Sequence, residues 1–249
     1  MLRIVICGAN GKMGKVIYNC LASRDNFEVI GGIDIDTNSY ADFQIVKSAN
    51  ELPETPDVII DYSHPNSLND LLSYAKSMHT PLVLATTGYD NEQIAFVKKA
   101  SSIVPIFFSW NMSLGINLLL SLSKKAASVL GDDFDIEIVE KHHNQKLDAP
   151  SGTALMLADA INDTDKPYRY EYDRHSKRGK RPNNEIGIHS VRGGTIVGEH
   201  EVLFAGRDEI ISLKHIANSK EIFAVGSINA AAFLVKQENG LYTMDELVS

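Results

Sequence analysis

The sequence contains few cysteines and no excess of positive charge, and each shortage excludes a class of protein. Its two cysteines, Cys7 and Cys20, lie in an apolar strand-like run and a helix-like run. We therefore interpret them as buried thiols of a protein in a reducing compartment, and not as a disulfide pair or a metal site. The 24 lysines and arginines stand against 32 aspartates and glutamates, which gives a net charge of −8. A general nucleic-acid-binding protein needs a basic face, so we expect no nucleic-acid partner.

Long apolar runs are also absent. No apolar stretch reaches the roughly 18 residues that a membrane-spanning helix requires. Residues 1–11 combine a short strand-like run with a turn, and they carry no small-residue cleavage site of a signal peptide. We therefore expect a cytoplasmic protein with no membrane partner. The length of 249 residues allows two modest domains or one large one.

The first hundred residues alternate between strand and helix patterns. Short apolar runs predict strands at 2–7, 27–33, 58–62, 81–85 and 104–109. Amphipathic stretches between them predict helices at 11–23, 67–78 and 91–101. Repeated strand–helix units with short connections indicate an α/β fold with a doubly wound parallel sheet.

The pattern changes after this region. A helix is expected over 113–130, an alternating strand over 134–140 and a further helix after Ser151. A polar stretch, 163–185, precedes strand-like runs at 186–191, 195–197, 200–204 and 210–215. These elements predict a second α+β domain with a mostly antiparallel sheet. We place the first domain at 1–112, with the apolar helix 221–235 and the rest of 221–249 returning to it, and the second domain at 113–220.

Three glycines follow the first strand with the spacing G-x-x-G-x-x-G: Gly8, Gly11 and Gly14. In a strand–turn–helix unit such glycines form the tight turn, admit a pyrophosphate and let the helix pack on the strand. Asp34 ends the second strand and can accept hydrogen bonds from ribose hydroxyls. We therefore predict a Rossmann-type dinucleotide-binding domain, with a tight turn that binds nothing as the alternative. The same turn contains the further candidates Asn10, Lys12 and Met13.

The sequence gives a weaker indication of whether the nucleotide is NADH or NADPH. Asp34 favours NADH because its carboxylate repels a 2′-phosphate, and Ile35 after it supplies no basic partner. Lys12, however, lies in the glycine turn and could reach such a phosphate. We expect NADH and/or NADPH as cofactor, with a preference for NADH.

Two further loops follow strands of the predicted parallel sheet. Ala85, Thr86, Thr87 and Gly88 follow the fourth strand and could line the nicotinamide side, because ligands lie beyond the carboxyl ends of such strands. His64, in the loop after the third strand, could touch a cofactor phosphate. A plain turn is the alternative at both places.

His142 and His143 are the only adjacent histidines in the chain. A metal site is not favoured, because neighbouring residues of an extended chain point opposite ways and no metal-ligand spacing surrounds the pair. Solvated polar residues at a strand end are one alternative. A general acid is the other, since histidine exchanges its proton near neutral pH.

The residues after the histidine pair favour the general acid. Lys146 is a compact cation with three hydrogen-bond donors. Pro150 is expected to open a helix, so that Ser151, Gly152 and Thr153 offer N–H groups and hydroxyls to an anion. The segment therefore predicts a proton donor beside an anion site.

Five segments carry a resemblance to one family. The pattern E-x-H-H-x-x-K-x-D-A-P-S-G-T-A at 140–154 resembles the signature of the 4-hydroxy-tetrahydrodipicolinate reductase (dihydrodipicolinate reductase) family. The glycine turn at 8–14, the A-T-T-G loop at 85–88, the join at 108–117 and V-R-x-G-x-I-V-G-E-H at 191–200 are similar too. The resemblance extends over essentially the whole chain.

The resemblance implies an activity and an assembly. It implies hydride transfer from NAD(P)H to C4 of a cyclic dicarboxylate imine in lysine and diaminopimelate biosynthesis. It also implies a homotetramer formed through the second domain, which would bind the substrate. His142 then matches the general acid, with Lys146 as the second catalytic candidate. The implied substrate-binding residues are His143, Lys146, Ser151, Gly152 and Thr153.

The resemblance also adds cofactor contacts. Besides the glycine turn, Asp34 and the A-T-T-G loop, it implies contacts at Ser109, Trp110, Asn111 and Met112. Ile35 and His64 stand where the family often has arginine, which puts a strong NADPH preference in doubt.

Two other functions fit parts of the sequence. Another two-domain dehydrogenase would use a different proton donor, and a non-catalytic NAD(H) sensor would bind the nucleotide without turnover. The basic run 174–181 could steer an anionic substrate. A mobile, solvated loop at a subunit contact is the simpler interpretation of that run.

Overall fold

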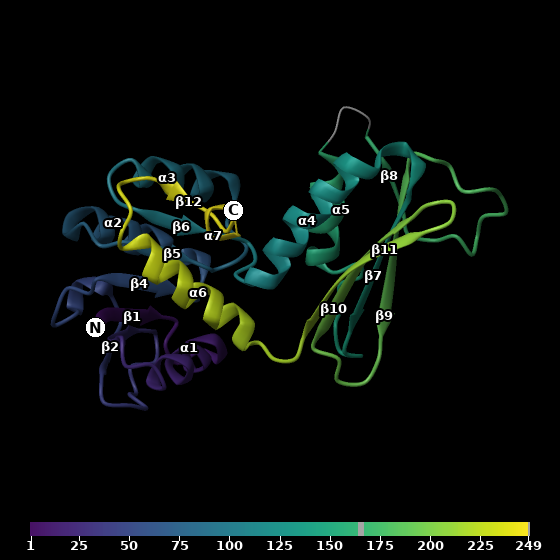
Figure 1. Ribbon diagram of the computed structural model, residues 1–249. Coiled ribbons are helices and arrows are strands. Elements are labelled where there is room, and N and C mark those ends of the chain that lie inside the picture. Colours follow the sequence, from purple (N-terminus) through teal and green to yellow (C-terminus); the bar gives the residue numbers. More distant parts are fainter. Residues whose placement is uncertain (164–166, 249) are drawn as a thin grey trace. The chain divides into compact units, whose positions relative to one another are not determined.

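The computed structural model describes residues 1–163 and 167–248, and the chain divides into two compact units (Figure 1). The first unit comprises Met1–Leu114 together with Glu221–Ser249, and the second comprises Gly115–Lys220. Each unit has its own sheet and its own buried apolar side chains, which lie on both faces of the sheet in the first unit. In the part of the chain that the structure describes, no helix is long and apolar enough to cross a membrane.

The first unit contains a seven-stranded sheet in the order β12-β6-β5-β4-β1-β2-β3. All of its pairings are parallel, as the repeated strand–helix pattern predicts. The strands are β1 (Leu2–Cys7), β2 (Phe27–Ile33), β3 (Gln44–Val46), β4 (Val58–Asp61), β5 (Leu82–Leu84), β6 (Ile106–Phe108) and β12 (Leu241–Tyr242). The sequence did not predict the edge strands β3 and β12, because runs of three and two residues are too short to show a period.

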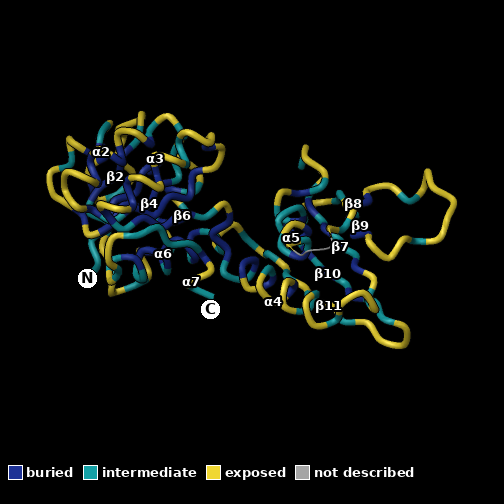
Figure 2. The backbone as a smooth tube through the Cα atoms, turned by 90° about the horizontal axis from the view of Figure 1, so that it is seen from above, coloured by how far each residue is buried: buried dark blue, intermediate teal, exposed yellow. Residues whose placement is uncertain are grey.

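Helices cover both faces of this sheet. They are α1 (Lys12–Ala22), α2 (Leu68–Met78), α3 (Asn91–Ser101), α6 (Glu221–Leu234) and the short α7 (Asp245–Val248). Ile4 and Ile6 of β1 join a core with α1 and α6, whereas Val5 and Cys7 join a second core with α2 and α3. This burial on both faces explains why β1 is an unbroken apolar run. In Figure 2 these strands are largely buried, with the exposed loops around them.

The second unit is built from a five-stranded sheet in the order β11-β10-β7-β9-β8 with helices α4 and α5 (Figure 1). Its elements are α4 (Leu114–Leu130), β7 (Asp135–His142), α5 (Gly152–Asn162), β8 (Arg169–Glu171), β9 (Glu185–Arg192), β10 (Gly198–Ala205) and β11 (Ile210–Ala217). Alternate residues of β7, such as Ile136 and Ile138, pack against Leu157 and Ile161 of α5. The other face carries Asp135, Glu137 and Lys141, with Val139 among them, which accounts for the alternation at the start of the strand.

This sheet is mixed, and the prediction of a mostly antiparallel sheet is wrong for one side of it. β10 pairs antiparallel with β7 and β11, but β9 pairs parallel with β7 and β8. The chain leaves β7 through α5, and such a crossover returns a strand in the same direction. The sequence pattern marks the strands but not the crossover.

Residues 195–197 form no strand, contrary to the prediction. They belong to the connection from β9 to β10, and these two strands lie on opposite sides of β7. The connection therefore passes the end of β7, where the Gly193 N–H donates to the His142 carbonyl at 2.9 Å. A segment that crosses the end of a strand has no partner for a ladder.

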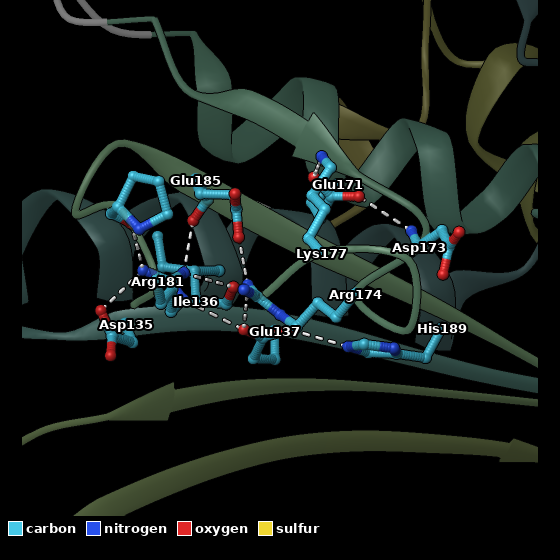
Figure 3. A network of polar contacts seen from close by, with 11 residues as sticks. Asp135, Ile136, Glu137, Glu171, Asp173, Arg174, Lys177, Arg181, Glu185 and His189 are labelled. Atoms are coloured by element: carbon cyan, nitrogen blue, oxygen red, sulfur yellow. Dashed lines mark hydrogen bonds and ion pairs between the residues drawn. The ribbon is translucent and has the colours of Figure 1, made fainter. Parts of the chain in front are cut away.

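The basic run 174–181 is held by carboxylates on its inner side, so it is not wholly solvated (Figure 3). Arg174 donates to Glu137 at 3.2 Å and also to Glu185, while Arg181 donates to Glu137 at 3.1 Å. The other oxygen of Glu137 lies 2.8 Å from His189. Residues 177, 178 and 180 remain exposed. Residues 164–166 of the polar stretch 163–185 lie outside the described part of the chain.

Candidate active site

The glycine turn between β1 and α1 requires its glycines for steric reasons. Gly8 has a φ of +79°, and a Cβ there would lie 2.7 Å from the carbonyl oxygen of Tyr62. A Cβ on Gly14 would overlap the carbonyl oxygen of Gly8, so the first turn of α1 packs directly on the end of β1. This close packing leaves a backbone cradle of the kind that admits a pyrophosphate.

A pocket of about 290 Å³ opens beside this turn. It lies at the carboxyl ends of the parallel strands, and its lining includes Gly8, Gly11, Asp34, Lys47, Tyr62 and His64. In a doubly wound sheet this edge is the ordinary place for a nucleotide. Lys47 was missed from the sequence because it follows β3, the short edge strand that the sequence did not reveal.

Asp34 is fixed at the rim of the glycine turn. Its carboxylate accepts from the Asn10 N–H at 2.9 Å and from the Asp36 N–H at 3.1 Å. The side-chain amide of Asn10 donates to the carbonyls of Asp36 at 2.7 Å and Asn38 at 3.0 Å. Asn10 therefore shapes the turn with its side chain. Lys12, at the first position of α1, is exposed.

The loop after β5 is fastened to Asp61, a buried carboxylate at the end of β4. Asp61 accepts from Thr86 Oγ1 at 2.8 Å, from Tyr89 Oη at 3.1 Å and from the Ser63 N–H at 3.0 Å. Thr86 and its neighbour Ala85 are buried. Among the predicted contacts of this loop, residues 87 and 88 are the exposed ones. The Thr86 hydroxyl therefore holds the loop in place.

The segment after β6 is ordered by its own polar groups. Ser109 Oγ donates to the Asn111 carbonyl at 2.9 Å, and Asn111 Oδ1 accepts from the Ser113 N–H at 2.9 Å. Trp110 is half-exposed and packs edge-on against Phe108. In contrast, Met112 and Met13 contribute to the core beneath α6 and α1.

In the second unit His142 ends β7 with its ring held by a buried glutamate. His142 Nδ1 lies 2.6 Å from Glu140 Oε2, and Glu140 is wholly buried. Burial alone would raise the pKa of Glu140, but hydrogen bonds from Arg192, Ser190 and His142 outweigh it and lower this pKa to about 2. Burial lowers the pKa of His142, although Glu140 acts in the opposite direction.

Ser151 caps helix α5 from a buried position. Its Oγ accepts from the Ala154 N–H at 3.1 Å and lies 2.8 Å from His200 Nε2. Its own N–H donates to Glu140 Oε1 at 3.2 Å. Burial, with His142 nearby, lowers the pKa of His200 to about 4, so this imidazole is neutral at pH 7. The Ser151 hydroxyl therefore points into the structure, and Gly152 is the exposed residue at the helix start.

Lys146 lies in the loop between β7 and α5. Its Nζ pairs with Asp148 Oδ1 at 2.8 Å, and the Asp148 carbonyl accepts from Arg192 at 2.7 Å. Lys146 N–H also donates to the His143 carbonyl at 3.2 Å, which makes a turn. The loop thus carries a cation whose present partner, Asp148, is itself more than half exposed.

The structure brings His142, Lys146 and the start of α5 into one region, as expected from the sequence. Sequence reasoning missed Glu140, Arg192 and His200, although all three lie in segments that carry the family resemblance. Their roles depend on register: Glu140 faces His200 of β10, and His142 faces Arg192 of β9. Nothing in the spacing along the chain reveals these pairings. Within residues 1–163 and 167–248, no group of three or more His, Cys, Asp or Glu could hold a metal ion.

Comparisons with known proteins agree over the whole length. The family model described as "Dihydrodipicolinate reductase, N-terminus" matches residues 2–112, and "Dihydrodipicolinate reductase, C-terminus" matches residues 115–248. A relative from Caldanaerobacter subterraneus subsp. tengcongensis, named 4-hydroxy-tetrahydrodipicolinate reductase, is 52% identical over 100% of this chain and 98% of its own. A relative of the same name from Clostridium tetani is 48% identical over 98% of this chain and 96% of its own.

A solved structure shares the fold. The dipicolinate-bound dihydrodipicolinate reductase from Paenisporosarcina sp. TG-14 matches with a TM-score of 0.83 over 100% of both chains. Its sequence is 24% identical to this chain, so the match supports the fold alone. It agrees with a parallel, Rossmann-type sheet followed by a mixed sheet.

Proposed function

The chain belongs to the dihydrodipicolinate reductase family, and we propose that it reduces 4-hydroxy-tetrahydrodipicolinate, through dihydrodipicolinate, to tetrahydrodipicolinate in lysine and diaminopimelate biosynthesis. It is on this basis an NAD(P)H-dependent oxidoreductase. The observation that carries the proposal is the full-length match to relatives of that name. The cluster around His142 supplies chemistry that fits the same reaction.

The residues of the first unit fit a pyridine nucleotide. The cradle at Gly8 and Gly14 has no room for a Cβ, and the pocket beside it is bordered by Asp34. In our proposal the turn from Gly8 to Gly14 holds the pyrophosphate, and Asp34 accepts from the adenosine ribose. The exposed residues 87, 88 and 110 are the candidates for the nicotinamide side. When bound, the nucleotide supplies the hydride.

We propose that both NADH and NADPH are accepted. Asp34 favours NADH, because a carboxylate accepts from two ribose hydroxyls but repels a phosphate. Lys47 and His64 line the same pocket as Asp34, and Lys12 is exposed at the start of α1. These basic groups compensate for Ile35, which stands where the family often has an arginine.

His142 is the proposed proton donor. Reduction at C4 leaves an electron-rich enamine that must take up a proton at the neighbouring carbon, and a positioned imidazolium contributes about 10²–10⁴-fold to such a step. Burial keeps the pKa of the free His142 low, and Lys146 and Arg192 add to this effect. A dicarboxylate bound nearby brings opposite charge and raises that pKa. Substrate binding therefore favours the protonated donor.

The start of α5 and Lys146 form the proposed dicarboxylate site. The helix presents N–H groups of Gly152 and Thr153 at its positive end. Lys146 can exchange its exposed partner Asp148 for a substrate carboxylate. His143, half-buried beside this loop, is a further candidate for that contact.

We also propose a cytoplasmic homotetramer assembled through the second unit. The sheet of this unit carries exposed apolar side chains at Val191, Ile210 and Ile216, which a subunit contact would cover. Sedimentation equilibrium of the purified protein tests this assembly. A monomer at micromolar concentration would contradict it.

The decisive experiment is a turnover assay. Substrate generated in place from aspartate semialdehyde and pyruvate should cause loss of nicotinamide absorbance at 340 nm when the protein is added. Nucleotide binding without turnover would favour the sensor. Turnover with another small substrate alone would favour a different two-domain dehydrogenase.

A further inference from the structure

Glu140 has both carboxylate oxygens fully occupied, and its partners come from three elements. Oε2 lies 2.6 Å from His142 Nδ1 and accepts from Arg192 Nη1 at 2.8 Å. Oε1 accepts from Arg192 Nη2 at 2.7 Å and from the Ser151 N–H at 3.2 Å. An ionised carboxylate has about four lone-pair sites, and these contacts, together with the hydrogen bond from Ser190, occupy them. The forked pair with Arg192 fixes the plane of the carboxylate.

The partners of Glu140 determine which nitrogen of His142 carries a proton. An ionised carboxylate only accepts, so the neutral imidazole must keep its proton on Nδ1. Nε2 is then the nitrogen that gains and loses the exchangeable proton. A Cβ added to Gly198 would lie 3.2 Å from this Nε2, which shows that a residue without a side chain faces it.

We infer that Glu140, clamped by Arg192, is the positioning residue of the reaction: it fixes the tautomer and orientation of His142, so that Nε2 delivers the proton. This inference rests on the proposed function, in which His142 is the donor. Neither Glu140 nor Arg192 touches the reacting atoms in this scheme. Both act through the imidazole that they orient.

The same carboxylate also fixes the anion site. Oε1 holds the N–H of Ser151, the residue that caps α5, and Arg192 reaches on to the Asp148 carbonyl at 2.7 Å in the loop of Lys146. Glu140 therefore holds the proposed proton donor and the start of α5 in fixed positions relative to each other. A shift of this one side chain would misplace both.

Glu137 offers a matched control on the same strand. It too is bound by arginines, Arg174 and Arg181, and by a histidine, His189 (Figure 3). Its side chain is 22% exposed, whereas that of Glu140 is 0% exposed. Glu137→Gln therefore removes a carboxylate with similar partners that the inference gives no role in the reaction.

The first test reads the imidazole directly. Nitrogen-15 NMR of the full-length protein should show His142 with its proton on Nδ1 in the neutral form. In Glu140→Gln the amide can donate to Nδ1, so we expect a switch toward the Nε2–H tautomer. The Glu137→Gln variant should keep the original tautomer. An unchanged His142 tautomer in Glu140→Gln would overturn the inference, whether or not the protein turns over the proposed substrate.

The second test is the pH dependence of turnover. The charged or titratable groups that face His142 are Glu140 on its own strand, Lys146 in the following loop, Arg192 on β9 and His200 on β10. Of these, Glu140 alone raises the pKa of His142. The fall of kcat with rising pH should therefore move to lower pH in Glu140→Gln, with kcat at pH 7.5 lower by at least about tenfold.

A structural role alone would leave a different signature. If kcat falls while the pH profile and tautomer stay those of the wild type, Glu140 only supports the fold and the inference fails. Should Glu140→Gln not fold, Arg192→Lys serves instead, because a single ammonium cannot make the fork. We expect Arg192→Lys to broaden the His142 resonances and to lower kcat, with an unchanged KM for NADH.

Discussion

At the scale of single residues, the proposed reaction depends on the protonation state of His142. Burial keeps the pKa of His142 below the ordinary value; Glu140 acts against this effect, while Lys146 and Arg192 add to it. A dianionic substrate supplies the charge that reverses this balance. In our proposal, His142 therefore takes up a proton as the substrate binds.

Substitutions of His142 and Lys146 should change different kinetic constants, kcat and KM respectively. His142→Ala removes the donor, so kcat should fall about 10²–10⁴-fold with little change in the KM of the dicarboxylate. Lys146→Ala removes a charged hydrogen bond worth about 1.5–3 kcal/mol, so that KM should rise about 10- to 150-fold. Steady-state kinetics measures both. The exposed His175→Ala and Lys125→Ala are controls, and unchanged kinetics in both test variants would remove these two assignments.

Lys47 should govern the use of NADPH. It lines the pocket that contains Asp34 and Ile35, where a 2′-phosphate would lie in our proposal. Lys47→Met should raise the KM for NADPH by about tenfold or more and leave the KM for NADH nearly unchanged. The exposed Lys99→Met, on α3, is the control. Equal effects on the two nucleotides would exclude a contact with the phosphate.

At the scale of elements, strand ends rather than strand middles carry the site. β7 ends at His142 and β9 at Arg192, while β10 begins at Gly198. The chain between β9 and β10 passes the end of β7, so these three ends meet. The sheet therefore places the carboxylate of Glu140, the guanidinium of Arg192 and the backbone of Gly198 around the His142 imidazole.

Gly198 should be needed to keep His142 accessible. In Gly198→Ala the new methyl group would lie 3.2 Å from His142 Nε2, closer than most Cβ contacts. We expect kcat to fall while the dissociation constant of NADH stays the same, because the change lies in the second unit. Gly179→Ala, with no atom within 4 Å of its Cβ, is the matched control. Wild-type kcat in Gly198→Ala would contradict the need for a glycine at this position.

At the scale of the whole molecule, the buried Glu140 couples the site to acid stability. Its pKa in the folded protein is about 2, below the ordinary 4.5. A carboxyl whose pKa is depressed by folding stabilises the fold above its unfolded pKa, and this contribution is lost as the pH falls. For Glu140 the loss occurs between about pH 4.5 and pH 2.

Glu140→Gln should therefore weaken the acid dependence of folding. The amide does not titrate, so its free energy of unfolding should fall less steeply between pH 4.5 and 2 than that of the wild type. Urea unfolding followed by circular dichroism at several pH values measures this slope. The remaining carboxylates are common to both proteins, so equal slopes would mean that Glu140 is not ionised in the folded state.

The sequence by itself determined the parallel sheet of the first unit, its glycine turn and the position of Asp34 after β2. These features depend on short-range rules: apolar runs covered on both faces, glycines where a Cβ would clash, and an acid at a strand end. The segment from His142 to Thr153 was also recognisable, because its residues are contiguous. The edge strands β3 and β12 could not be predicted, because they are too short to show a periodic pattern of apolar residues.

Only the tertiary structure decided what surrounds His142. Glu140 was predicted as a strand residue, yet its partners Arg192 and Ser151 come from another strand and a helix start. Register and crossover connections bring these residues together, and no spacing along the chain encodes either. The parallel pairing of β7 with β9 follows from the same crossover. Residues close in the sequence thus indicate the proposed proton donor, but long-range pairing brings the carboxylate of Glu140 and the guanidinium of Arg192 to it.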